Sequence, residues 1–272
     1  MKNFAFGQYY PSGSVVHRLD ARIKLILAFL YIVCVFLCEN QYAFLLTAVS
    51  AVMLCMISRI PIGTIIKSMK SILFILLFTV VINVFFTKGE VLIVNWQFIQ
   101  VYKEGVIKAV FMGVRIIALI LGTSIFLTYT TTPIALTDAL EDIMSPLKKI
   151  KVPVHDISMM LTIALRFIPT LVDETDKIMS AQKARGADFT TGGLVKRAKA
   201  LIPVLVPLFV SSFRRADELA VAMECRCYRG GEGRTRMKIP RYSATDFAAL
   251  FVMIAFGVAV VLINIFAPGY TV

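Results

Sequence analysis

Five apolar runs are separated by short charged turns, a pattern typical of a chain that crosses a membrane several times. The runs cover residues 25–38, 42–57, 71–86, 109–129 and 247–266, and Arg115 is the one charged residue inside them. The first two are shorter than the ~20 residues that cross a bilayer. They form either two closely connected spans or one re-entrant hairpin, and we favour two spans.

The region from about residue 131 to residue 245 differs from the apolar runs. It holds 18 of the chain's 29 Lys and Arg residues, which argues against a simple transmembrane segment. Apolar residues nevertheless recur at the spacing of one helix face: Ile157, Met160, Ala164, Ile168 and Leu171. We predict a long amphipathic helix that starts at Pro153 and stops at Gly186, because Pro suits a first helical turn and Gly a helix end.

Two further helices are predicted in this region. One runs from about Pro207 to Tyr228, and a shorter one begins near Thr132 and Pro133 and ends before Pro146. The expected fold is therefore an all-α integral membrane protein of about five transmembrane helices. Residues 1–130 form four spans, residues 131–245 form a cytoplasmic region of long amphipathic helices, and residues 246–272 form the last transmembrane helix.

The distribution of charge predicts the orientation. Seven cations precede the first run or follow the second: Lys2, Arg18, Arg22, Lys24, Arg59, Lys67 and Lys70. The opposite loops hold Lys88, Lys103 and Lys108, partly offset by Glu90 and Glu104. Since cytoplasmic loops carry an excess of Lys and Arg, we expect a multi-pass protein of the inner (cell) membrane. Its N-terminus is then cytoplasmic and its C-terminus extracytoplasmic.

Composition excludes several classes of function. The chain is 58% apolar with a net charge of +12, and basic residues beside spans indicate lipid contact, so we expect no nucleic-acid partner. Its five cysteines form no disulfide framework, and His17 and His155 lack neighbouring ligands for a metal. No glycine is followed by lysine, so the sequence contains no phosphate-binding loop of the G-x4-G-K-[ST] type. We expect no catalytic residue, cofactor or metal on this chain.

One pattern occurs twice, 41 residues apart. Two sets of residues share the order D-x4-A-x3-R: Asp176, Ala181 and Arg185, and Asp217, Ala222 and Arg226. The helix dipole alone favours an arginine in a last helical turn. Two cytoplasmic helix ends with matched spacing favour a pair of docking tips instead.

These residues carry a resemblance to a known family. The segments 164–169 (ALRFIP) and 181–186 (AQKARG) resemble the signature helix of the transmembrane T component of energy-coupling factor ABC transporters. The stretch from Pro207 through 215–219 (RADEL) to Arg226 resembles that family's second coupling helix, and 17–20 (HRLD) resembles its N-terminal stretch.

The sequence departs from the family pattern at two places. Ala21 stands where the family often has Pro, and the second tip reads Cys225-Arg226-Cys227 in place of Ala-Arg-Gly. Because Cys227 lacks the freedom of Gly at positive φ, the position of that helix end stays open.

The resemblance implies a non-catalytic coupling subunit of an ATP-driven importer. ATP and Mg would bind two ATPase subunits, A and A′, and the substrate, a vitamin or related micronutrient, would bind a separate membrane protein, the S component. It also implies that six tip residues dock into grooves of the ATPases: Ala184, Arg185, Gly186, Cys225, Arg226 and Cys227. The resemblance does not identify the substrate, and it is compatible with either a dedicated or an exchanged S component.

Other classes fit the residues less well. A membrane scaffold needs only one docking surface, whereas this chain has two matched ones. A secondary transporter usually has ionisable residues near the middle of the membrane and repeats among its spans. Arg115 is the one candidate, and we interpret it as a side chain that snorkels to a nearby interface rather than one that serves the bundle interior. A membrane enzyme ranks last.

Overall fold

The chain divides into two compact units. The computed structural model describes residues 9–87, 89, 91–96, 99–189, 191, 193–230 and 242–267, so Lys88 and Glu90 lie outside the described part. The first unit, called the bundle unit below, covers Gly7–Ala139 and Pro240–Val272. The second, called the arm unit, contains Leu140–Ile239.

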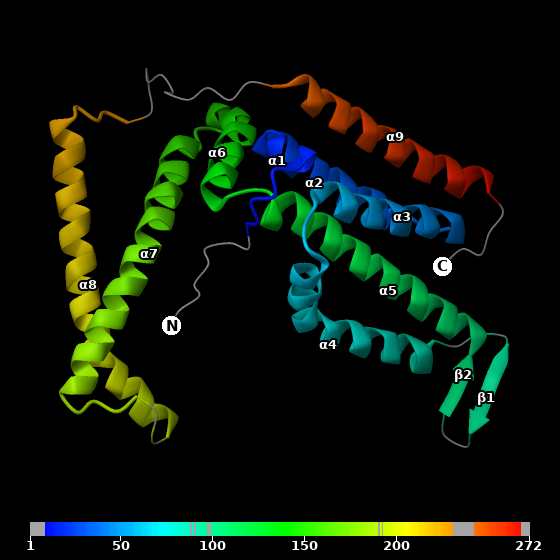
Figure 1. Cartoon of the computed structure of the whole chain (residues 1–272), viewed down its shortest axis with the longest axis horizontal. Coiled ribbons are helices and arrows are strands. Elements are labelled where there is room, and N and C mark those ends of the chain that lie inside the picture. The colour runs from blue at the N-terminus through cyan, green and yellow to red at the C-terminus, as the bar shows by residue number, and fades with distance from the viewer. Residues whose placement is uncertain are drawn as a thin grey trace. The chain divides into compact units, whose positions relative to one another are not determined.

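The bundle unit is built from helices that alternate in direction (Figure 1). They are α1 (Val15–Arg18), α2 (Ala21–Phe36), α3 (Gln41–Ser58), α4 (Ile62–Phe86), α5 (Lys103–Thr123), its π-helical continuation η1 (Ser124–Tyr129) and α9 (Ala244–Phe266). An antiparallel hairpin of β1 (Leu92–Trp96) and β2 (Ile99–Tyr102) connects α4 to α5. Helix α6 (Pro133–Ile143) leads out of this unit. The hairpin was not predicted.

Length and composition mark this chain as an integral membrane protein. Four helical segments of the described residues suit a membrane span: α3, Lys103–Tyr129, α9 and α7 (Val154–Ala184) of the arm unit. Helix α2 has 16 residues and the apolar part of α4 is Ile72–Phe86, so both are shorter. Each of the five predicted apolar runs is helical, and the all-α membrane class is confirmed apart from the small hairpin.

Two helices begin six or more residues earlier than their apolar runs. Helix α4 starts at Ile62 instead of residue 71, and α5 starts at Lys103 instead of residue 109. The added turns contain Lys67, Lys70 and Glu104, which are good helix formers but are not apolar. Hydropathy therefore located the apolar part of each helix and missed the charged turns at its start.

The core of the bundle unit forms around Tyr31 of α2. Its side chain is 1% exposed and lies 6.3 Å from the ring centroids of both Phe126 and Phe256. A Cβ atom on Gly122 would overlap the Tyr31 ring, so a glycine at this position lets α5 approach α2 closely. The contact joins α2 to the end of α5 and to α9.

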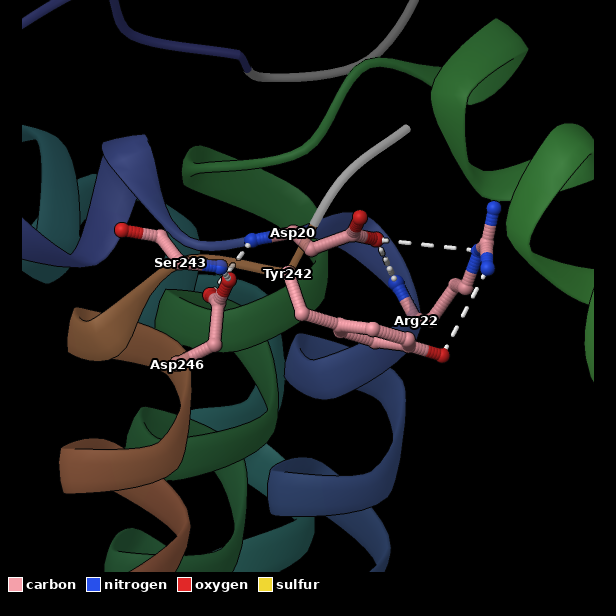
Figure 2. A network of polar contacts seen from close by, with 5 residues as sticks. All are labelled: Asp20, Arg22, Tyr242, Ser243 and Asp246. Carbon is pink, nitrogen blue, oxygen red and sulfur yellow. Dashed lines mark hydrogen bonds and ion pairs between the residues drawn. The ribbon is translucent and has the colours of Figure 1, made fainter. Parts of the chain in front are cut away.

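Asp246 ties the starts of α2 and α9 together (Figure 2). Its Oδ1 accepts a hydrogen bond from the backbone N–H of Asp20 at 3.0 Å, and its Oδ2 accepts one from the N–H of Ser243 at 2.7 Å. The Asp20 carboxylate in turn accepts the N–H of Arg22 as the N-cap of α2. Arg22 extends the network to the Tyr242 hydroxyl at 3.4 Å. Each helix start thereby gains the acceptor that its free N–H groups need.

Lys24 brings a third segment to the same end of the bundle unit. Its Nζ donates to the backbone carbonyls of His17 at 3.1 Å and Thr130 at 2.7 Å, and the residue is 3% exposed. The N-terminal stretch, α2 and the chain just after η1 are thus held by one ammonium group.

The opposite end of the bundle unit has its own polar connections. Asn264 of α9 accepts from the N–H of Asn40 and donates to the Leu37 carbonyl at 2.6 Å. Arg115 of α5 donates from Nη2 to the Cys38 carbonyl at 2.7 Å and lies over the Phe44 ring at 5.0 Å. Arg115 therefore binds the carbonyl end of α2 at one end of the bundle unit, and its snorkelling to an interface stays a prediction.

The arm unit contains a 3₁₀ helix, η2 (Ser145–Ile150), and two long helices, α7 and α8 (Leu194–Cys225). The starts of α6 and α7 and the stop of α7 agree with the predictions. The predicted start of α8 at Pro207 was wrong, because the helix begins at Leu194 and holds Pro203 and Pro207 in its interior.

The two prolines in α8 create a contact with α7. A helical N–H normally bonds the carbonyl four residues earlier, and Pro207 has no N–H to offer Pro203. Gln182 of α7 donates its Nε2 to the free Pro203 carbonyl at 3.3 Å. The carbonyl that Pro207 leaves unpaired in α8 thus accepts a hydrogen bond from α7.

The Asp246 network predicts a stability effect. Asp246→Ala should lower the free energy of unfolding by roughly 2–4 kcal/mol, because two N–H groups lose their acceptor at a buried position. Asp246→Asn keeps one carbonyl oxygen and should cost less. Thermal unfolding of the purified protein in detergent measures both, and equal stability of the Ala variant and the parent would contradict the role of this carboxylate.

Candidate functional site

The first helix tip is closed by a hydrogen-bond pattern that requires a left-handed residue. Helix α7 ends at Ala184, and Gly186 follows with φ of 87°. The N–H of Gly186 bonds the Lys183 carbonyl at 3.0 Å, and the N–H of Ala187 bonds the Gln182 carbonyl at 3.0 Å. This pair of bonds is the Schellman arrangement, in which the residue after the helix adopts positive φ.

The second tip has the same conformation at positions shifted by 41 residues. Helix α8 ends at Cys225, and Cys227 has φ of 58°. The N–H of Cys227 bonds the Glu224 carbonyl at 2.8 Å, and the N–H of Tyr228 bonds the Met223 carbonyl at 3.0 Å. The question left open by the sequence is answered: Cys227 takes the left-handed conformation that Gly186 takes in the first tip.

All six predicted tip residues are exposed at these two helix ends. Arg185 and Arg226 each occupy the position between the last helical residue and the left-handed one. Each guanidinium therefore stands at a helix C-terminus, where the dipole favours a cation. A guanidinium offers five donors in a rigid fork, which suits carboxylates and carbonyls on a partner surface.

The two long helices pack antiparallel, and their tips lie at opposite ends of the pair (Figure 1). Arg215 of α8 donates from Nη2 to Oε2 of Glu174 in α7 at 2.7 Å. These two residues are themselves 41 positions apart. The ion pair thus joins equivalent positions of the two repeated helices.

Along its own helix, each tip lies at the same distance from this ion pair. Eleven residues separate Glu174 from Arg185, and eleven separate Arg215 from Arg226. At 1.5 Å per helical residue each tip lies about 16 Å from the ion pair. The sequence analysis found the repeat but did not identify Glu174 and Arg215, although their shared offset of 41 was present in the sequence.

Other titratable residues of the arm unit form a smaller contact. Nδ1 of His155 lies 3.1 Å from Oε1 of Glu141, which joins the start of α7 to the end of α6. In the described part of the chain, no group of three or more His, Cys, Asp and Glu residues is placed to hold a metal ion. Cys225 and Cys227 are exposed and free.

The fold and the tips define a class: a polytopic membrane protein that carries two matched, exposed helix tips. Comparison with known proteins narrows this class. Residues 12–238 match the family model described as cobalt transport protein. A protein of Ruminiclostridium cellulolyticum named energy-coupling factor transporter transmembrane protein EcfT is 50% identical over 97% of this chain and 98% of its own length. Proteins of the same name from Clostridium kluyveri and Bacillus subtilis are 50% and 45% identical over 92% and 93% of this chain, and over 92% and 96% of their own lengths.

Matches of this extent establish the family. The chain belongs to the energy-coupling factor transporter transmembrane proteins. It is accordingly a membrane component of a transporter, as the resemblance of its coupling-helix segments implied.

The conformation of the tips leads to a prediction with opposite signs at the two sites. Gly186→Val should loosen the first tip by about 1 kcal/mol, because a branched residue resists positive φ. Nothing lies within 4 Å of a Cβ built there, so the effect is one of backbone conformation. Cys227→Gly should tighten the second tip by a similar amount. Amide hydrogen exchange at Ala187 and Tyr228 measures both.

A matched control is available at Gly193, the N-cap of α8. Its φ is −69° and no atom lies within 4 Å of a built Cβ, so Gly193→Ala should leave both tips unchanged. If exchange at Ala187 stayed the same in Gly186→Val, the left-handed residue would not hold the tip closed.

Proposed function

We propose that this chain is the coupling subunit of an energy-coupling factor importer. It transmits ATP hydrolysis by two cytosolic ATPase subunits, A and A′, to a substrate-binding S component that takes up vitamins or related micronutrients. The observation that carries the proposal is the identical closure of the tips at Gly186 and Cys227. Two similar partner subunits would each bind the same helix-end conformation, and both tips have that conformation.

The spacing of the tips supports two separate partners. Each tip lies about 16 Å along its helix from the Glu174–Arg215 ion pair, so straight antiparallel helices place the tips about 33 Å apart along the helix axes. Two ATPase subunits that close on ATP would move such tips toward each other. Because both helices meet at one ion pair and at the Gln182–Pro203 hydrogen bond, a force on either tip reaches the other helix.

The proposed docking residues are Ala184, Arg185, Gly186, Cys225, Arg226 and Cys227. The small residues beside each arginine let the helix end enter a narrow groove. The arginine then offers its fork to carboxylates or carbonyls in that groove. ATP and Mg belong to the partner subunits under this proposal, and this chain performs no catalysis.

An apolar face of α8 is the proposed contact for the S component. Val206, Phe209, Val210 and Phe213 of this face are all exposed, and Phe213 reaches 68%. They follow at helical spacing on the segment between Pro203 and Arg215. A membrane partner with an apolar helix face would bury them, and motion of α8 would then act on that partner directly.

The proposed orientation places the arm unit in the cytoplasm and the end of α9 outside. Helix α1, the start of α2, the end of α3 and the start of α9 lie at one end of the bundle unit (Figure 1). The first three of these segments hold the cations Arg18, Arg22, Lys24 and Arg59, and cytoplasmic loops carry such an excess. We expect an impermeant maleimide to label Cys225 and Cys227 in inside-out vesicles and to spare them in right-side-out vesicles. Both cysteines are exposed, whereas Cys34 and Cys38 are buried. Equal labelling of the two preparations would contradict this orientation.

The two arginines test the docking mechanism. Arg185→Ala or Arg226→Ala removes charge-assisted contacts worth about 1.5–3 kcal/mol and should leave a weakened complex, since the other tip still tethers it. The double variant should lose the ATPases, and Lys at either position should rescue only partly because it lacks the fork. The measurements are the ATPase that co-purifies and vitamin uptake by reconstituted vesicles.

A control for charge is Arg197→Ala, which removes an exposed arginine of α8 far from its tip. It should assemble and transport like the parent. The docking role would be overturned by a double variant that retains its ATPases and transports at the parent rate, because the arginines would then serve only the helix ends.

A further inference from the structure

The 3₁₀ helix η2 carries a dense group of unpaired cations. Lys148 and Lys149 lie within it and Lys151 directly follows, and all three are exposed. Among the described residues, none forms an ion pair with these lysines, and the neighbouring Glu141 is engaged by His155. Three positive charges are therefore free to bind an external anion.

Exposed aliphatic side chains stand among these lysines. Ile150 is 73% exposed, and Leu147 and Ile143 are each 37% exposed. The sequence of this stretch therefore alternates apolar and cationic groups, as SPLKKIK. A single exposed aliphatic residue is ordinary, but several of them beside a group of lysines form a mixed apolar and cationic surface.

The end of η2 is shaped to present these residues together. Lys151 has φ of 63°, and its N–H bonds the Lys148 carbonyl at 3.0 Å. A left-handed lysine costs about 1 kcal/mol relative to glycine, so the tight turn is maintained against a local penalty. It reverses the chain between η2 and α7 and leaves Ile150 at the outside of the turn.

The chain also keeps η2 close to a membrane span. Tyr129 ends the span formed by α5 and η1, and η2 begins at Ser145. The eleven residues of α6 fill most of that interval, and a helix rises 1.5 Å per residue. Helix and linkers together reach no more than about 36 Å, so η2 stays within reach of the bilayer surface.

We propose that η2 is a membrane-surface anchor that binds anionic lipid headgroups. Lys148, Lys149 and Lys151 pair with lipid phosphates, and Ile150 and Leu147 enter the boundary between headgroups and acyl chains. This mixture favours a bilayer over a protein partner, because an acidic protein surface satisfies the lysines but leaves the aliphatic residues exposed. The anchor holds the start of α7 at the membrane while its tip is free to move. Only the assignment to the cytoplasmic leaflet depends on the proposed orientation.

The test places a fluorescent reporter at the proposed contact. The chain has a single tryptophan, so Ile150→Trp in a Trp96→Phe background gives one indole at η2. The full chain is reconstituted in nanodiscs of phosphatidylcholine, with or without phosphatidylglycerol, whose acyl chains are brominated. We expect strong quenching in the anionic discs and weak quenching in the neutral ones.

Removal of charge separates this anchor from incidental contact. Lys148→Gln with Lys149→Gln should lower the ratio of bound to unbound η2 about fivefold for each lysine. The matched control, Lys196→Gln with Lys199→Gln in α8, removes two exposed charges elsewhere and should change nothing. Salt at 1 M shortens the Debye length to about 3 Å and should release η2 without any substitution of a lysine, which guards against variants that misfold.

Three outcomes would overturn the anchor. The first is equal quenching in neutral and anionic discs, and the second is quenching that survives both the lysine substitutions and high salt. The third is an indole that no lipid quenches but that shifts to shorter wavelength when ATPase subunits are added, which would assign η2 to a protein partner. Because the quenching is measured before any ATPase is added, its failure is distinguishable from failure of the docking mechanism.

Discussion

The ammonium group of Lys24 is buried at one end of an apolar helix bundle. The segments that meet at this end are positioned by their interactions with that charge. A buried cation is stable only where partners replace the water it has lost. The carbonyls of His17 and Thr130 accept hydrogen bonds from its Nζ, and the carboxylates of Asp20 and Asp246 attract it. These partners come from the N-terminal stretch, the start of α2, the chain after η1, and α9. One cation thereby fixes four segments that lie far apart in the sequence.

The arm unit is stabilised in a different way. Its two long helices share one ion pair, Glu174–Arg215, and one side-chain hydrogen bond, Gln182 to Pro203, while most of their apolar side chains stay exposed. A half-exposed ion pair contributes little to stability, and no buried cation joins these helices among the described residues. The bundle unit is thus suited to hold its shape, and the arm unit is suited to transmit displacement along stiff helices with few contacts to break.

The sequence predicted which helices exist better than it predicted where each helix begins and ends. Apolar runs located all five long helices of the bundle unit, because a run of uncharged residues reports burial or lipid contact directly. It missed the hairpin of β1 and β2, which is too short for periodicity to identify, and it placed the start of α8 at Pro207. Proline removes one helical N–H and crowds the carbonyl four residues earlier. In α8 the carbonyl that Pro207 leaves unpaired receives a donor from Gln182 of another helix. A hydrogen bond between two helices of this kind cannot be identified from the local sequence around the prolines.

The candidate site was predicted more completely than the polar network of the bundle unit. Tip residues are local: an arginine, small neighbours and a left-handed residue lie within four positions, so the repeat of 41 residues is visible in the sequence. Asp246, Ser243 and Asp20 come together only after folding, since 226 positions separate Asp20 from Asp246. Arg115 shows the same limit, because its acceptor is the backbone carbonyl of Cys38, and a backbone carbonyl has no signature in the sequence.

The offset of 41 residues has a geometric consequence beyond the tips. In a pair related by a two-fold axis, a residue near the axis meets its own equivalent, and Glu174 meets Arg215 in this way. The symmetry is local, because the Gln182–Pro203 bond has no counterpart in sequence: the equivalent positions are Met223 and Thr162. Opposite charges at equivalent positions also make the two helices distinguishable. The pair can thus offer the same closure to two similar partners while each helix keeps its own place in the chain.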